Sequence, residues 1–240
     1  VNVLIEANSI FIGDDVSGTT DTAANSVAVG VDALDAVTTG DANVAIGKSA
    51  LSGNTTGANN IAIGNQALNA PDTEGSNLAI GSNALNGSIA GGEYNVAIGN
   101  SSLAALTSAD KTTAVGYGSG TGLTTGSLNT FIGYQSAAAI TSGARNVIIG
   151  HETADAASTP DRSVIIGDGA VGIGVLTGND NIVIGAAAGE DLTTGTILTL
   201  IGTGAGQNIT EGNDTTLIGY DAGTNVTTET NNLGIGRAAL

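Results

Sequence analysis

Glycine recurs along the whole chain directly after a short apolar segment, at an almost constant spacing. NVAIG ends at Gly47, NIAIG at Gly64 and NLAIG at Gly81. The glycines of this kind are Gly13, Gly30, Gly47, Gly64, Gly81, Gly99, Gly116, Gly133, Gly150, Gly167, Gly185, Gly202, Gly219 and Gly236, separated by 17 residues at eleven steps and by 18 at two. Such a period indicates a solenoid with one coil per repeat. Because 17 residues suit two short strands and two corners, we predict an all-β parallel solenoid, or β-roll, of about 14 coils.

Each repeat also carries apolar residues at fixed distances from its glycine. The residue before the glycine is Ile or Val in every copy, and the residue three before it is Val, Ile or Leu, or Thr in four copies. Residues two apart share one face of a strand, so we predict that both point into the coil. The predicted coil core contains Ile46, Ile63, Ile80, Ile98, Ile132, Ile149, Ile166, Ile184, Ile201 and Ile218. An apolar residue seven after the glycine, such as Leu106 or Leu123, would fill the core from the opposite side.

The strand position between these two, two residues before the glycine, is never polar. It holds Ala45 and Ala62 in early copies and Phe131 and Ile148 in later ones. A strand that is apolar on both faces is covered on both faces. With one face assigned to the coil core, the other predicts an interface between copies of the chain around a symmetry axis.

Where the side chain at this position is small, the side chain four residues after the glycine is large, and the reverse also holds. Ala62 is accompanied by Leu68, whereas Leu217 is accompanied by Gly223. Such a trade is typical of volume-conserving packing, so we predict that both positions fill one layer at the interface between copies. That layer contains Ala45, Leu51, Ala62, Leu68, Ala79, Leu85, Ala97, Leu103, Phe131, Ile148, Ile165, Leu200 and Leu217.

Asparagine recurs four residues before the glycine, as in Asn43, Asn60 and Asn77. Stacked amides can satisfy backbone groups at the corners of neighbouring coils, so we interpret this column as structural.

Charge excludes several classes of partner. The chain has 22 acidic and five basic residues, a formal net charge of −17, and no cysteine. It carries no basic stripe for nucleic acid or anionic membranes, and no apolar run long enough for membrane insertion.

The repeats fill residues 1–240 without a linker, which predicts a single repeat domain. Because the chain begins at Val1 and stops within a repeat, we interpret it as an excerpt of a longer fibrous protein.

The inventory of reactive side chains argues against an enzyme. His151 is the only histidine, so no second imidazole can join it in a metal site or a proton relay. Carboxylates cluster at Asp14–Asp15 and Glu190–Asp191, but glycoside hydrolysis needs two carboxylates facing each other across a cleft. We therefore predict no catalytic residues, no metal and no cofactor.

The position directly after the glycine is the most variable of the repeat, as expected for an outward corner. Tyr117, Tyr134 and His151 occupy it in consecutive copies. Exposed aromatic residues favour interfaces, so this ladder is a candidate outer contact with a receptor. The alternative is ring stacking that serves only the solenoid.

Four copies, NVAIGKSAL, NIAIGNQAL, NLAIGSNAL and NVAIGNSSL, together resemble the YadA-like head repeats of trimeric autotransporter adhesins. NTFIGYQSA and TTLIGYDAG look like related repeats of phage tail fibres. The resemblance covers every copy, although the familiar heads use a somewhat shorter coil.

The resemblance implies a left-handed parallel β-roll, a homotrimer, and attachment to a host cell-surface or matrix protein or a glycan. It implies an extracellular place, on a bacterial surface anchored in the outer membrane or on a virion fibre. The expected function is a structural and adhesive fibre segment. The alternative is an architectural spacer that carries a receptor-binding tip elsewhere.

Overall fold

The fold is an all-β parallel solenoid of about 13 turns with a period of about 17 residues. The structure is a computed structural model that describes residues 2–6, 8–13 and 23–240. The repeat strands are β2 to β15, which delimit about 13 turns rather than the predicted 14 coils. The described residues contain no helix.

The chain divides into two compact units, Val1–Gly118 and Ser119–Leu240. Each unit carries the same repeat, and a single domain over residues 1–240 stays a prediction. The first unit contains β1 (Asn2–Glu6), β2 (Ser9–Gly13), β3 (Val27–Val29), β4 (Val44–Ile46), β5 (Ile61–Ile63), β6 (Leu78–Ile80), β7 (Val96–Ile98) and β8 (Thr113–Val115). The second contains β9 (Thr130–Ile132), β10 (Val147–Ile149), β11 (Val164–Ile166), β12 (Ile182–Ile184), β13 (Thr199–Ile201), β14 (Thr216–Ile218) and β15 (Leu233–Ile235).

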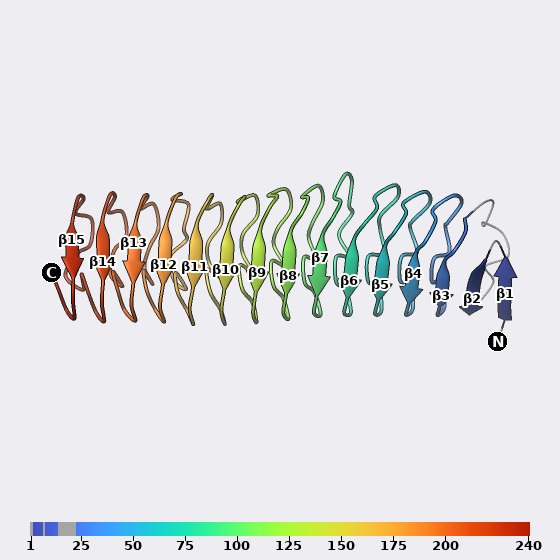
Figure 1. The fold of residues 1–240 in the computed structure, drawn as a ribbon, viewed down its shortest axis with the longest axis horizontal. Coiled ribbons are helices and arrows are strands. Elements are labelled where there is room, and N and C mark those ends of the chain that lie inside the picture. Colours follow the sequence, from blue (N-terminus) through green and yellow to red (C-terminus); the bar gives the residue numbers. More distant parts are fainter. Residues whose placement is uncertain (1, 7, 14–22) are drawn as a thin grey trace. The chain divides into compact units, whose positions relative to one another are not determined.

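Within each unit, successive repeat strands pair in parallel, side by side in chain order (Figure 1). Each residue lies beside its equivalent in the next repeat, as Ala45 lies beside Ala62. The register is kept across both 18-residue repeats, where Leu78 pairs with Val96 and Val164 with Ile182. The extra residue is therefore accommodated outside the paired strands.

The N-terminal strand departs from the repeat. β1 pairs antiparallel with β2 through a tight turn in which Asn8 has a φ of 62°. Asparagine tolerates this left-handed conformation better than most residues. The parallel stack of the first unit thus begins with a hairpin, which the repeat pattern did not predict.

The recurring glycine lets neighbouring coils approach closely at the corner after each strand. Gly47 has a φ of 131°, and a Cβ atom there would overlap the carbonyl oxygen of Gly64 in the next coil. A side chain at this position would therefore be strained both by its backbone conformation and by the contact.

The predicted assignment of the two strand faces is wrong: the structure places the proposed interface layer inside the coil. Every member of that layer has no exposed surface within a single chain: Ala45, Leu51, Ala62, Leu68, Ala79, Leu85, Ala97, Leu103, Phe131, Ile148, Ile165, Leu200 and Leu217. The second predicted core position is confirmed, since Leu106 and Leu123 are fully buried as well.

The predicted coil core lies on the outward face instead. Ile46 is 39% exposed and Ile132 is 37% exposed. The other members are partly exposed: Ile63, Ile80, Ile98, Ile149, Ile166, Ile184, Ile201 and Ile218. Alternation along a three-residue strand leaves only its middle side chain for the interior.

Large and small side chains do compensate each other at the two positions, but they do so inside a single coil. A Cβ atom on Gly223 would overlap Leu217 Cδ1 of the same repeat, and one on Gly206 would lie 2.9 Å from Leu200 Cδ2. The two positions share the narrow interior of a single coil, so their volumes must compensate there rather than between chains.

Buried asparagines connect the coils, as the sequence predicted. Asn60 Oδ1 accepts a hydrogen bond from the backbone N–H of Asn77, 3.0 Å away, and Asn60 Nδ2 donates to the carbonyl of Glu74 at 2.8 Å. Asn77 does the same for Asn95 and Gly92 in the next coil. Each amide therefore satisfies two backbone groups that a corner would otherwise leave unpaired.

Candidate interaction surfaces

The outward face of the strands is an apolar surface in both units. It is formed by the first and third residues of each strand, which project away from the coil. In the second unit the third residue is always isoleucine, at Ile132, Ile149, Ile166, Ile184, Ile201, Ile218 and Ile235. We call these two columns of side chains the strand face. A contiguous apolar surface of this kind on a single chain is typical of an interface.

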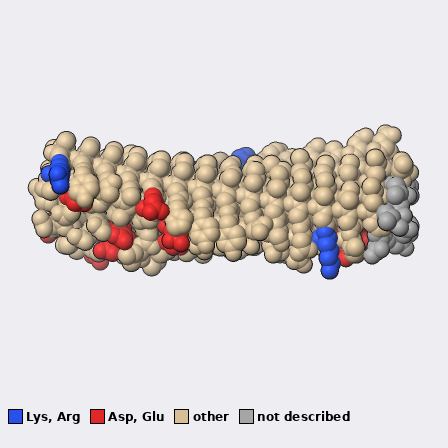
Figure 2. Space-filling model, turned by 90° about the horizontal axis from the view of Figure 1, so that it is seen from below, with Lys and Arg blue, Asp and Glu red and all other residues tan. Residues whose placement is uncertain are grey.

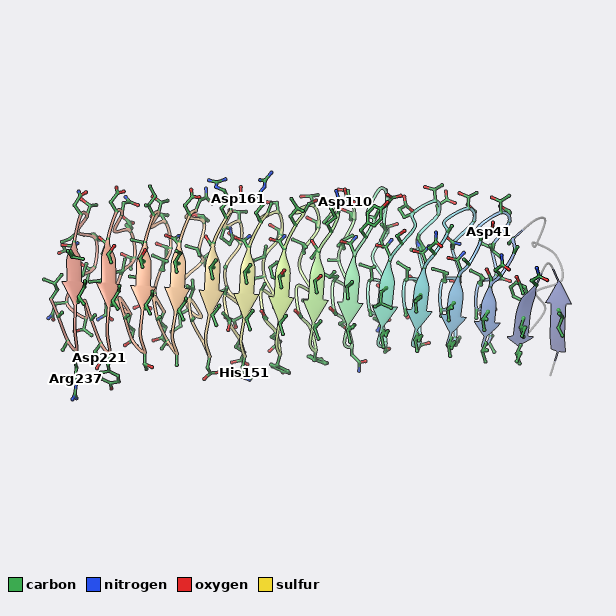
Figure 3. All side chains as sticks on the ribbon, in the orientation of Figure 1. Asp41, Asp110, His151, Asp161, Asp221 and Arg237 are labelled. Atoms are coloured by element: carbon green, nitrogen blue, oxygen red, sulfur yellow. The ribbon has the colours of Figure 1, made fainter. Side chains whose placement is uncertain are left out.

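Charged residues lie at the corners rather than on the strand face. In the second unit Asp161 lies at the end where strands begin, and His151, Asp221 and Arg237 lie at the end where they finish (Figure 3). In the first unit Asp41 lies where strands begin. On the side shown in Figure 2, acidic side chains are scattered over the second unit among uncharged areas.

Two residues of the predicted ladder of rings are in contact in the second unit. Tyr134 and His151 stack with 5.3 Å between ring centroids and an angle of 13° between ring planes. The column continues to Asp168, whose Oδ1 lies 3.1 Å from His151 Nδ1. Tyr117 belongs to the first unit, where its side chain is exposed. The stacked pair and its carboxylate are solvent-exposed, so their edges are available for contact.

A second aromatic contact occupies the same corner near the C-terminal end of the second unit. The guanidinium carbon of Arg237 lies 5.5 Å from the ring centroid of Tyr220. The sequence period places these residues in one column, but the cation–π contact was not predicted.

An exposed ion pair joins two neighbouring coils at the opposite corner. Arg162 donates from Nε and a terminal nitrogen to the two carboxylate oxygens of Asp180, at 2.7 and 2.8 Å. The hydrogen bond from Arg162 lowers the pKa of Asp180. Both side chains are open to solvent, so the pair contributes little to stability.

Two glutamates hold a turn ten residues after the recurring glycine, where other repeats have glycine, as at Gly40 and Gly57. Glu74 Oε2 accepts hydrogen bonds from the backbone N–H groups of Asp72 and Thr73, at 3.0 and 3.1 Å. Its Oε1 accepts another from Gly91 in the following coil at 2.8 Å. Burial raises the pKa of Glu74, but these backbone donors outweigh burial and the pKa is lowered. Glu229 holds the corresponding turn in the second unit in the same way.

Of the two predicted carboxylate clusters, only Glu190–Asp191 lies within the described residues. Glu190 accepts a hydrogen bond from Gln207, while Asp14 and Asp15 lie outside the described residues. Burial, and then the charge of Glu152, raises the pKa of Asp155. Among residues 2–6, 8–13 and 23–240, no group of three or more His, Cys, Asp or Glu could hold a metal ion.

No helix in the described part of the chain has the length and apolar character to cross a membrane. The architecture and period make the chain a β-solenoid repeat protein. No family model, curated protein or solved structure matches it.

Proposed function

We propose that this chain is a structural and adhesive segment of a fibre, in which copies associate through the strand face. The observation that carries the proposal is an uncharged apolar face on a chain of net charge −17. Association through this face removes isoleucine and valine side chains from water. It also keeps the acidic corners of the copies apart.

We infer that the assembly is a homotrimer of left-handed coils, because the repeats resemble YadA-like heads. The structure revises only the residues involved. The contact between copies uses the first and third strand residues, such as Val147 and Ile149, and not the buried middle residue, Ile148. A rotation axis parallel to the stack brings the same face of every copy together.

The adhesive part of the proposal concerns the corners, which stay exposed when the strand faces meet. The Tyr134–His151 stack is the most aromatic part of the second unit's exposed corner. We propose that corners of this kind contact a host cell-surface or matrix protein, or a glycan, outside the cell. The carrier is a bacterial surface fibre or a virion fibre, and residues 1–240 themselves insert into no membrane.

Native mass spectrometry of the chain tests the assembly, and the trimer mass is expected. Ile149→Ser with Ile166→Ser should give monomers with an unchanged far-ultraviolet circular dichroism spectrum. The matched control is Ile173→Ser with Ile197→Ser, two exposed isoleucines outside the strand face, which should leave the trimer intact. A monomeric wild-type chain at tens of micromolar would refute the proposal.

Binding of the labelled trimer to immobilised matrix proteins and to host cells tests adhesion. Replacement of Tyr117, Tyr134 and His151 by serine should reduce binding without changing the trimer mass. Tyr220→Ser, on the same corner column, is the control. A trimer that binds none of these surfaces supports the alternative, an architectural spacer, which association through the strand face serves equally well.

A further inference from the structure

Three threonines interrupt the strand face of the second unit. Thr130, Thr199 and Thr216 are the first residues of β9, β13 and β14, and their side chains are half-buried. In the part of the chain that the structure describes, none of these three hydroxyls forms a hydrogen bond. They are therefore polar groups with free hydrogen-bonding capacity on an otherwise apolar face.

Some hydroxyls elsewhere in this unit bond to the backbone of the solenoid itself. Ser136 Oγ, inside the coil, donates to the carbonyl of Ile148 at 3.0 Å. Thr193 Oγ1, at a corner, donates to the carbonyl of Thr210 in the next coil at 2.9 Å. The threonines of the strand face make no such bond, so their hydroxyls can pair with groups outside the coil.

A strand face made of identical repeats does not by itself align two chains. The third-residue column is isoleucine throughout the second unit, so sliding one copy by a coil, about 4.8 Å, again places isoleucine beside isoleucine. The first-residue column reads Thr, Val, Val, Ile, Thr, Thr, Leu from β9 to β15. Only this column distinguishes one coil from the next.

We propose that Thr130, Thr199 and Thr216 set the register in which copies of this chain associate. The inference rests on the proposed function and names the partner of the strand face: a second copy, parallel and in register. Rotation about an axis parallel to the stack leaves each residue at the same position along that axis. Each threonine therefore lies beside its equivalents in the other copies. Their hydroxyls pair with one another there, directly or through a water molecule.

A slipped register loses these pairs. In the matched register, each of the three threonines of the second unit lies beside the same threonine of the other copy. When one copy slips by one coil, a single threonine pair remains in this unit, Thr199 beside Thr216. This slip places Thr130 beside Val147 and the remaining hydroxyls beside Ile182 and Leu233. A hydroxyl buried against an apolar side chain has no partner, which disfavours that register. A single polar position in an apolar seam fixes the register of coiled coils in the same way.

Cysteine cross-linking tests the register, because the chain has no cysteine of its own. Chains with Ile149→Cys and chains with Ile184→Cys are refolded together and mildly oxidised. The two sites lie two strands apart, about 10 Å, which exceeds the reach of a disulfide. We expect same-site disulfides and almost no mixed 149–184 disulfide. With Thr130→Val, Thr199→Val and Thr216→Val, the mixed disulfide should rise at least fivefold.

Two further variants separate register from packing. Serine at the same three positions keeps the hydroxyls and should restore the wild-type pattern. Valine at Thr125, Thr194 and Thr228, which are exposed corner residues, should change nothing. An unchanged level of mixed disulfide in the strand-face valine variant, with same-site disulfides still forming, would overturn the register proposal alone. Monomers, or oligomers without same-site disulfides, would overturn the proposed assembly as well.

Discussion

The inward orientation of the middle strand residue can be tested at Gly223 and Leu217. Gly223 lies four residues after the corner glycine of its repeat, and a Cβ atom there would overlap Leu217 Cδ1 and lie 2.9 Å from Leu217 Cδ2. Leu217 is fully buried within a single chain. Gly223→Ala should therefore overpack the coil, whatever the oligomeric state.

Two effects contribute to the cost of Gly223→Ala. Its φ of 74° lies in the left-handed region, which costs alanine about 1 kcal/mol. Alanine already occupies this repeat position at Ala137 and Ala154, with φ of 58° and 50°, so the backbone alone does not forbid it. Overpacking against Leu217 adds about 1 to 3 kcal/mol and is the larger effect.

A double-mutant cycle isolates the packing effect. Leu217→Ala alone should cost about 2 to 5 kcal/mol through the cavity it leaves. In the double variant the new methyl group occupies part of that cavity, so the loss should fall short of the sum of the single losses by about 1 to 3 kcal/mol. Guanidinium denaturation followed by circular dichroism measures the loss, and amide exchange shows whether it is confined to the coils around β14.

The control is Gly169→Ala, which also has a left-handed φ, 59°, but has no heavy atom within 4 Å of the added Cβ. It should cost no more than about 1 kcal/mol, the backbone contribution alone. If Gly223→Ala were no worse than Gly169→Ala, or if its loss were additive with that of Leu217→Ala, the inward assignment would be refuted.

Three other changes test the polar groups of the first unit. Asn77→Ala leaves the buried N–H of Asn95 and the carbonyl of Gly92 unpaired, and should cost about 2 to 5 kcal/mol in denaturation, with faster exchange at the Asn95 amide. Asn54→Val removes a buried Oδ1 that has no partner, together with the bond from Asn54 Nδ2 to the carbonyl of Gly57, which keeps Asn43 Nδ2 as a donor. The free energy of unfolding should therefore rise by about 1 kcal/mol, and a fall would contradict this. Glu74→Gln should destabilise the chain at neutral pH. Because the pKa of Glu74 is lowered in the folded state, its carboxylate stabilises the fold above the ordinary carboxyl pKa. This stabilisation is lost progressively as pH falls below that ordinary value and through the lowered pKa, so the two proteins should converge in acid.

The repeat spacing was sufficient to predict the solenoid, its period and the strand before each recurring glycine. The second strand expected in each coil is wrong, because each repeat has a single strand and turns complete the coil. Contact between neighbouring coils requires glycine at the corner, as Gly47 and Gly64 show. The spacing of these glycines therefore equals the number of residues in one coil. The asparagine column was predictable for the same reason, since a buried amide can bond to the equivalent position one repeat away.

Which face of the strand points into the coil could not be predicted from hydrophobicity, because both faces are apolar. Larger apolar residues are usually the buried ones, which favoured Ile46 over Ala45. The coil interior is narrow, however, and Leu51 enters it from the corner with a left-handed φ of 55°, a conformation that leucine rarely adopts. The space left beside that leucine suits only alanine.

The candidate contacts were predictable in part. The period alone placed Tyr134 and His151 in one column, where they stack. The strand face was missed because its residues had been assigned to the core. Threonine begins the strand in four repeats, and this indicated that the first strand position faces outward. A fully buried coil core would rarely accept threonine without a hydrogen-bond partner.

The in-register pairing of one repeat with the next makes the number of coils an adjustable quantity. Removing or duplicating one whole repeat leaves every strand, asparagine and corner glycine beside an equivalent, whereas a change of a few residues within a repeat must be absorbed outside the strands. Recombination between repeats of a gene encoding such a chain can therefore lengthen or shorten the stack without designing a new core. The length of the stack becomes a heritable property that needs no new packing, and the denaturation midpoint of variants with one repeat more or fewer measures what a single repeat contributes to stability.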